Sequence, residues 1–436
     1  MNFKSLLIIL MSLSPFIHTV KFNYAKFTCP LMSYVNSYIK KTALPYEEIK
    51  KTYIMGNTSC DLDSFLSSYL LSIPKNFDKD INKTNKLYLP LINCGRNELP
   101  YRFDIHYLCK RFGINRQSLP YITDKKVQRD LKLNKDAKVI LVDHNKPDSS
   151  QFNMIANHVT GVYDHHKDSN FHFYNMKTNK NITFPLGSCT TLILKKFFIT
   201  NPILFKYVSP LLSVSAILMD TENFNKELYK RKWIKEDKDV FNKVIAMDKT
   251  FTPQYINNFY KELSSLKYSE KKNLNLGVHG ILAKDKKSFV WNEMHNTIRG
   301  GWSTLQVSFD KIIKKYGYNR FFDTIVHSCQ EKHYDIYLCN YSDKFYSHVD
   351  SKINLKVKCF IIYNYEMNDE RFEALIKGVS SLLGMRLYKR EDVVFDKKNN
   401  RKFTRFYVHQ AISRKHFEPV IRDYFLHYNV KTENEA

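Results

Sequence analysis

Apolar runs of strand length alternate with amphipathic stretches along the first half of the chain. The runs TYIM and KVILV, at residues 52–55 and 138–142, have the length and apolar character of buried strands. After the first run, Phe65, Leu66 and Tyr69 recur at the spacing of one helix face. Such alternation predicts a mostly parallel sheet with helices on both faces. The predicted strands are residues 52–55, 87–92, 138–142 and 161–163, and the predicted helices are residues 42–51, 61–72, 105–112, 189–198 and 211–219.

A second unit follows residues 248–260, where Pro253 lies in a polar stretch that interrupts the pattern. We place a domain boundary in this segment or slightly later. The expected elements beyond it are an apolar stretch at 274–282, helices at 309–318 and near 371–383, and strands at 334–338 and 357–363. The predicted fold class is α/β, with an N-terminal doubly wound, mostly parallel sheet and a smaller C-terminal α/β domain.

The composition narrows the choice of partner. A length of 436 residues suits two domains, and 12 Gly with 13 Pro exclude a collagen-like or low-complexity chain. Lys and Arg number 68 against 43 Asp and Glu, and both halves of the chain share the net charge of +25. This excess points to a polyanionic partner: nucleic acid, an anionic membrane or a phosphate-rich substrate. A Lys- and Asn-rich composition without functional meaning stays open as the alternative.

The cysteines and the N-terminal residues indicate in which cellular compartment the protein is expected. Eight scattered cysteines without a CxxC pair favour neither a disulfide framework nor a structural zinc site. The 13 apolar residues Ser5–Ile17 are typical of a signal peptide or signal anchor within residues 1–25, and are too short for a full membrane crossing. A buried helix is the alternative, since residues 18–21 match a cleavage site poorly. We expect a secretory or vesicular location, with the cytoplasm as the alternative, and membrane contact only through an uncleaved anchor.

Polar side chains follow the ends of the predicted strands. Asn57, Asp61 and Asp63 form an N-x-x-x-D-x-D pattern after the first strand, and Asp143-His144 ends the strand at residues 138–142. A lone D-x-D is more typical of helix capping than of chemistry. In open α/β sheets, however, functional residues collect at the carboxyl ends of the strands. Both groups lie at such ends.

Two further groups complete the pattern. Asp164, His165 and His166 end the next strand, and adjacent histidines point in different directions, so one can bind metal while the other faces substrate. Asp220 follows an apolar helix, where a carboxylate needs a partner such as a cation or must give up its charge. Each group alone favours a structural explanation. Their occurrence in order, each at the end of a buried element, favours a metal centre.

The segments GNTSCDLDS, LVDHN, YDHH, PLGSCTT and SAILMDT resemble, in this order, the motifs of DHH phosphoesterases. Among these they are most similar to eukaryotic exopolyphosphatases, with family II inorganic pyrophosphatases and prune-type proteins as relatives. The resemblance implies a DHH catalytic metal-binding domain at residues 30–250. It resumes at SRKHFEP, which implies a DHH-associated, substrate-binding domain at residues 255–436. Asn57 stands where the pyrophosphatases have a histidine, and His166 is retained where prune-type proteins resemble DHR.

The resemblance also implies the site, which would lie in the cleft between the two domains. It implies two divalent ions, Mg²⁺ or Mn²⁺ with Co²⁺ possible, that activate a water for attack on the terminal phosphorus. The implied metal ligands are Asn57, Asp61, Asp63, Asp143, His165 and Asp220, with Asp143 bridging. The implied substrate contacts are His144, His166, Ser413, Arg414 and Lys415, with Asp143, His144 and His166 as catalytic residues. The amide oxygen of Asn57 in place of an imidazole favours Mg²⁺ or Mn²⁺, and His166 would donate a proton towards the leaving oxygen.

The predicted function is therefore an exopolyphosphatase that removes the terminal phosphate from inorganic polyphosphate or another small phosphoanhydride. One alternative is a pyrophosphatase, or a nucleotide or cyclic-nucleotide phosphohydrolase, with the same metal centre. A single-strand nuclease is disfavoured, because no RNA-binding module or aromatic basic repeat is present, and no nucleic-acid partner is expected. A noncatalytic polyanion-binding protein is a third possibility, against which the complete set of ligands argues.

Overall fold

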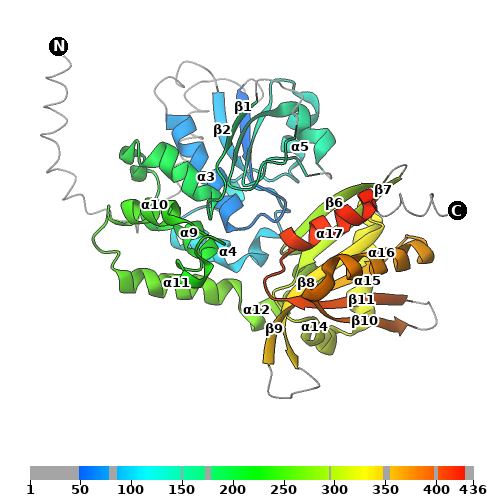
Figure 1. Ribbon diagram of the computed structural model, residues 1–436. Helices are drawn as coiled ribbons and strands as arrows, with labels where there is room; N and C mark the ends of the chain where they lie inside the picture. Colours follow the sequence, from blue (N-terminus) through cyan, green and yellow to red (C-terminus); the bar gives the residue numbers. More distant parts are fainter. Residues whose placement is uncertain are drawn as a thin grey trace, which may run out of the picture.

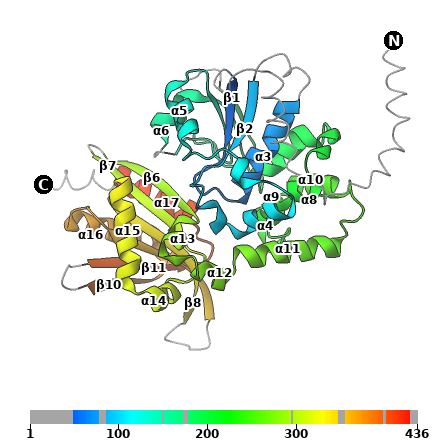
Figure 2. The same ribbon diagram turned by 180° about the vertical axis from the view of Figure 1, so that it is seen from behind.

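The computed structural model describes residues 49–77, 86–148, 151–171, 178–293, 296–346, 354–396 and 401–427. The predicted leader at residues 1–25 lies outside them. Figure 1 shows two α/β units, the first drawn in blue to green and the second in yellow to red, and Figure 2 shows them from behind. None of the helices in the described ranges has both the length and the apolarity needed to span a bilayer.

The first unit contains a five-stranded sheet in the order β2-β1-β3-β4-β5, in which every neighbouring pair is parallel. The strands are β1 (Lys50–Met55), β2 (Lys86–Leu91), β3 (Lys138–Val142), β4 (Val159–Asp164) and β5 (Asn179–Ile182). The predicted parallel sheet is confirmed. The predicted helix at 42–51 is wrong at its end, because Lys50 and Lys51 pair with β2 as the first residues of β1. All five strands direct their carboxyl ends to one edge.

Helices flank this sheet, with α3 and α5 on opposite sides of it (Figures 1 and 2). Tyr53 of β1 donates its hydroxyl hydrogen to Asp130 of α5 at 2.7 Å. The predicted helix at 211–219 is divided into two short helices at Val214. The helices of this unit are α3 (Leu62–Phe77), α4 (Phe103–Arg111), α5 (Lys125–Leu133), α6 (Phe152–Ile155), α7 (Cys189–Ile193), α8 (Pro210–Ser213), α9 (Ser215–Asp220) and α10 (Lys235–Ile245).

The second unit contains a mixed six-stranded sheet in the order β10-β11-β9-β8-β7-β6, in which only β7 and β8 are parallel. Its strands are β6 (Lys286–Glu293), β7 (Asn296–Thr304), β8 (Ile336–Tyr346), β9 (Asn354–Asn364), β10 (Leu387–Asp396) and β11 (Arg401–His409). Its helices are α13 (Gly277–Ala283), α14 (Phe309–Tyr316), α15 (Tyr318–Lys332), α16 (Asp369–Leu383) and α17 (Arg414–His427). The predicted helix at 309–318 ends at Gly317, whose φ of 76° separates α14 from α15.

Each unit has its own hydrophobic core. The first core runs from Ile49 to Leu263. Two clusters, one beginning at Val278 and the other at Trp291, fill the second unit. The connection is made by α11 (Pro253–Lys267) and α12 (Glu270–Leu274). Although residues 248–260 were predicted to break the pattern, α11 begins at Pro253, because proline suits the first helical position. The first core therefore reaches a little beyond residue 250.

Candidate active site

The loop between β1 and α3 carries the first predicted group. Asp61 caps α3, because its Oδ1 accepts the amide hydrogen of Ser64 at 3.1 Å, and Asp63 lies in the first helical turn. Gly56 allows this loop to approach the helix, since a Cβ there would lie only 2.5 Å from Cβ of Ser64. The capping geometry is the ordinary one for Asp. It also directs two carboxylates to the carboxyl edge of the sheet.

The PLGSCTT segment, residues 185–191, holds Asp63 in place. Oδ1 of Asp63 accepts the hydroxyl hydrogen of Ser188 at 2.7 Å and the amide hydrogen of Thr190 at 2.9 Å, and Oδ2 accepts the amide hydrogen of Cys189 at 2.7 Å. These donors stabilise the negative charge. The segment is itself anchored by Asp237 of α10, whose carboxylate accepts the amide hydrogen of Gly187. The sequence alone identified this motif but did not predict that it holds the Asp63 carboxylate.

Asp143 occupies the centre of the cluster. Its backbone has a φ of 60°, in the left-handed region that few residues adopt. Its Oδ2 accepts hydrogen bonds from the Ser64 hydroxyl at 2.7 Å and from the side-chain amide of Asn57 at 2.8 Å. Burial, followed by the charges of Asp63 and Asp61, raises the pKa of Asp143 to about 7. The carboxylates therefore repel one another strongly.

Asn57 is the predicted ligand whose geometry differs most from expectation. Its Oδ1 accepts the amide hydrogen of Ser59 at 2.9 Å, and its Nδ2 faces Asp143. An amide nitrogen does not bind a cation, so the Asn57 group that points to the cluster orients Asp143. The preference for Mg²⁺ or Mn²⁺ predicted from its oxygen stays a prediction.

The ring of His165 is oriented for metal binding. Its Nδ1 lies 2.8 Å from the carbonyl oxygen of Leu186, and because a carbonyl only accepts, Nδ1 carries the proton. The lone pair on Nε2 then points to Oδ1 of Asp143 at 3.2 Å and to Oδ2 of Asp63 at 3.7 Å. A hydrogen bond from the remote ring nitrogen to a carbonyl is the usual way in which a metal-binding histidine is held.

Asp164 fixes the neighbouring ring of His166. Its Oδ1 accepts from Nδ1 of His166 at 2.8 Å and from two backbone amides, and its Oδ2 accepts from Asn145 at 2.6 Å. Burial alone would raise the pKa of Asp164, but the hydrogen bond and charge of His166 hold this pKa well below its usual range. Ligand atoms of Asp143, Asp164, His165 and His166 lie within 4.8 Å of one another. Because both oxygens of Asp164 already accept hydrogen bonds, the role of Asp164 is to orient His166.

Asp220 ends α9, as predicted, and faces the same cluster. Burial, followed by the charge of Asp63, raises the pKa of Asp220 well above its usual range, while Lys267 acts against this. Its Oδ2 is buried, and within the described residues it has no hydrogen-bond partner. A buried carboxylate oxygen without a donor is costly unless a cation or a proton satisfies it. This oxygen, the crowded carboxylates and the His165 lone pair together fit divalent cations.

The second unit brings positive charge to this cluster. Arg414, the first residue of α17, contacts Oδ1 of Asp285 at 3.0 Å, and Asp285 accepts the hydroxyl hydrogen of Ser59 at 3.0 Å. Burial would raise the pKa of Asp285, but Arg414 and then Lys287 lower it to about 2. Lys287 of β6 interacts electrostatically with Asp61 and Asp143. Sequence reasoning missed Lys287, because nothing distinguishes it within the run KDKK.

The other predicted substrate contacts are Ser413, Lys415 and His144. The hydroxyl of Ser413 lies 2.8 Å from Nδ1 of His416, at the start of α17. Lys415 is the second residue of that helix. Nδ1 of His144 donates to the carbonyl oxygen of Val142 at 2.8 Å, and burial lowers the pKa of this histidine. Its ring is therefore neutral at pH 7.

Comparison with known proteins identifies the first unit. The profile described as "DHH family, N-terminal domain" matches residues 51–234. Residues 51–234 form a DHH-family domain. The match confirms the family predicted from the four ordered groups.

Two curated relatives of this DHH domain are named exopolyphosphatase PRUNE1. The human protein is 25% identical over 177 residues, which are 41% of this chain and 37% of that protein. The bovine protein is 25% identical over 180 residues, with the same coverage. The matched region thus spans little more than a third of these relatives.

A solved structure resembles both units. A Methanococcus jannaschii protein, whose structure is described as that of a "putative family II inorganic pyrophosphatase", has a TM-score of 0.50 and 16% identity, and the alignment covers 86% of this chain and 99% of that one. This likeness concerns the fold alone. It confirms the predicted α/β architecture, with the DHH domain followed by a second unit that contains a mixed sheet.

Proposed function

We propose that this chain is a metal-dependent exopolyphosphatase that releases the terminal phosphate from inorganic polyphosphate. One observation carries the proposal: four carboxylates and the lone pair of His165 gather at one sheet edge, while Lys287 and Arg414 of the second unit lie beside them. Carboxylates and an imidazole suit divalent cations, and the two basic side chains suit phosphate groups. The names of the curated relatives support the same activity.

The residues that would hold the cations are Asp61, Asp63, Asp143, His165 and Asp220. Bound there, two divalent ions would lower the pKa of a water and neutralise phosphoryl oxygens. Asp143 lies between the other carboxylates, which suits the bridging role predicted for it, and its orientation comes from Ser64 and Asn57. Both donate to Oδ2, which leaves Oδ1 facing Nε2 of His165.

Proton transfer is assigned to His166. Its Nδ1 hydrogen is held by Asp164, so a proton on Nε2 would be available to the oxygen of the departing phosphate. The Asp164 carboxylate stabilises the imidazolium form, in the way that an aspartate supports the histidine of hydrolytic triads. The Nδ1 hydrogen of the half-buried His144 is held by the carbonyl oxygen of Val142, so this residue would donate to a phosphate oxygen through Nε2 only in its protonated form.

Lys287 and Arg414 are assigned to the phosphates next to the scissile one. We expect Lys287→Ala to raise KM for tripolyphosphate by about 10- to 100-fold, the range that corresponds to loss of one charged hydrogen bond, with a smaller change in kcat. Initial rates over a range of substrate concentrations measure both constants. Lys286→Ala is the matched control, because successive residues of β6 point to opposite faces of the sheet. Equal KM values for the two variants would remove Lys287 from the substrate site.

The function itself is tested by phosphate release from long polyphosphate, tripolyphosphate and pyrophosphate, each with Mg²⁺, Mn²⁺ or Co²⁺. We expect release from long chains with Mg²⁺ or Mn²⁺ and none in a chelator. Activity confined to pyrophosphate would replace the proposal with a pyrophosphatase. Activity with Co²⁺ but not Mg²⁺ would contradict the predicted ligand set, and no release from any substrate would favour a polyanion-binding protein without catalysis.

A further inference from the structure

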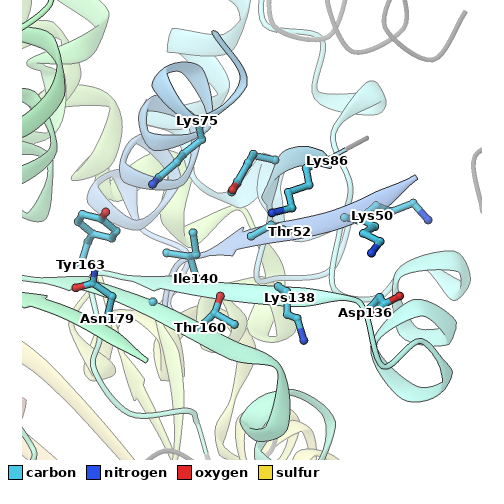
Figure 3. A pocket seen from close by; sticks show the side chains of 13 residues that line it. Lys50, Thr52, Lys75, Lys86, Asp136, Lys138, Ile140, Thr160, Tyr163 and Asn179 are labelled. Carbon is cyan, nitrogen blue, oxygen red and sulfur yellow. The ribbon is translucent and has the colours of Figure 1, made fainter. Parts of the chain in front are cut away.

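A pocket of about 400 Å³ lies at the end of the first sheet opposite the acidic cluster (Figure 3). Lys50, Lys86 and Lys138, which line it, are the first residues of β1, β2 and β3. The acidic cluster follows the last residues of the same strands. A strand of six residues spans about 17–20 Å, which separates these three lysines from the acidic cluster, whereas Tyr163, which also lines the pocket, directly precedes Asp164 in β4.

The pocket is strongly basic. Lys75 reaches it from the last turn of α3, above the strands, and Asp136 is the one carboxylate in the described lining (Figure 3). Lys50 and Lys86 are register partners in β1 and β2. Like charges in directly paired positions destabilise a sheet, and a bound anion with several charges offsets their repulsion.

The floor of the pocket combines polar and apolar groups. Thr52 and Thr160 supply hydroxyl groups, of which that of Thr160 also reaches the carbonyl oxygen of Val139, and Ile140 supplies an apolar side chain (Figure 3). Gly161, which also lines the pocket, has no side chain. Tyr163 forms one end, where burial and then the nearby Tyr88 raise its pKa, so its hydroxyl stays a donor. Hydroxyl donors and ammonium groups around one space are the groups that bind phosphate oxygens. The volume lies within the range of about 300–1,000 Å³ that is typical of small-ligand sites.

We propose that this pocket binds a short oligophosphate group, as a second anion site that requires no metal. The group can belong to inorganic tripolyphosphate or to a nucleoside triphosphate. The occupant is held by Lys50, Lys75, Lys86 and Lys138, and the site is independent of the residues assigned to catalysis.

Calorimetric titration of the full chain with tripolyphosphate, in a chelator and at a fixed low salt concentration, tests the pocket. We expect binding that Lys50→Glu/Lys86→Glu weakens at least tenfold. The control is Lys125→Glu/Lys132→Glu, which makes the same change of net charge on exposed positions of α5. The Lys287→Ala/Arg414→Ala protein should bind as the unsubstituted protein does, which separates the pocket from the proposed active site. Circular dichroism checks that each variant is folded.

The possible results are distinct. Selective loss in the pocket variant supports the site, and a parallel titration with ATP shows whether a nucleotide shares it. Equal weakening in both double variants would mean general attraction to a basic protein, and would overturn the proposal. So would an absence of binding in the chelator, or binding that only the Lys287→Ala/Arg414→Ala protein loses. None of these results depends on whether polyphosphate is hydrolysed.

Discussion

The Asp143→Asn protein is expected to fold normally and to release phosphate more than about 100-fold more slowly than the unsubstituted protein, the upper end of the cost of changing a residue that merely supports a metal ligand. Asparagine keeps an oxygen that can accept from Ser64 and Asn57. Its new amide group can donate to Nε2 of His165, which lies 3.2 Å from the replaced oxygen. The packing is preserved, whereas the charge that would be shared by two cations is lost.

Initial rates with tripolyphosphate and Mg²⁺ measure this effect, and circular dichroism confirms the fold. Asp239→Asn serves as the control, because Asp239 is exposed on α10. The control should retain full activity. Unchanged turnover in Asp143→Asn would refute the metal centre, and loss of folding would show that the carboxylate has a structural task that the hydrogen bonds do not reveal.

The second large effect concerns stability. Asp220→Asn should lower turnover severely, yet raise the melting temperature of the chelator-treated protein by about 3 °C or more, since 1 kcal/mol corresponds to about 2–4 °C for a unit of this size. The folded protein raises the pKa of Asp220, so it binds the proton more tightly than the unfolded chain does. Ionised Asp220 therefore costs stability increasingly as the pH rises above about 4, the ordinary value for Asp. The advantage of asparagine should be small near pH 4 and largest near pH 8.

Thermal melts at several pH values, with chelator and with Mg²⁺ or Mn²⁺, measure this linkage. The cation should stabilise the unsubstituted protein more than the variant. Asp237→Asn offers a contrast, because the buried Asp237 already accepts hydrogens from Gly187, Thr191 and Ile234. That variant should melt at a lower temperature near neutral pH, although burial also raises the pKa of Asp237, because an amide cannot accept all of these hydrogens. A lower melting temperature for Asp220→Asn in chelator at pH 8 would show that Asp220 is satisfied in the folded state without a cation.

The parallel sheet and the acidic groups could be predicted because their signals are local. A buried parallel strand is a continuous apolar run, and the residues that follow its carboxyl end reach a shared edge without any knowledge of side-chain packing. Asp143 follows such a run, Asp164 ends another, and Asp220 ends a buried apolar helix, as the sequence predicts. The domain match confirms the family of residues 51–234, and the likeness to the solved structure confirms the α/β fold.

Other features depend on contacts between distant segments. Lys287 interacts with Asp61 and Asp143 only because the second unit places β6 against the first, and no pattern within KDKK identifies it. The direction of the Asn57 amide is set by Ser59 and Asp143, which lie on different loops. The strands β10 and β11 were missed because charged residues interrupt their apolar positions.

The left-handed backbone at Asp143 limits which residues can replace it during evolution. Aspartate, asparagine and glycine adopt this conformation readily, whereas branched side chains do not. A lineage that drifted from aspartate to asparagine here would keep its architecture and its basic surfaces while its chemistry disappeared. Inactive paralogues with asparagine at this position would therefore keep the fold and could evolve to bind ligand without catalysis.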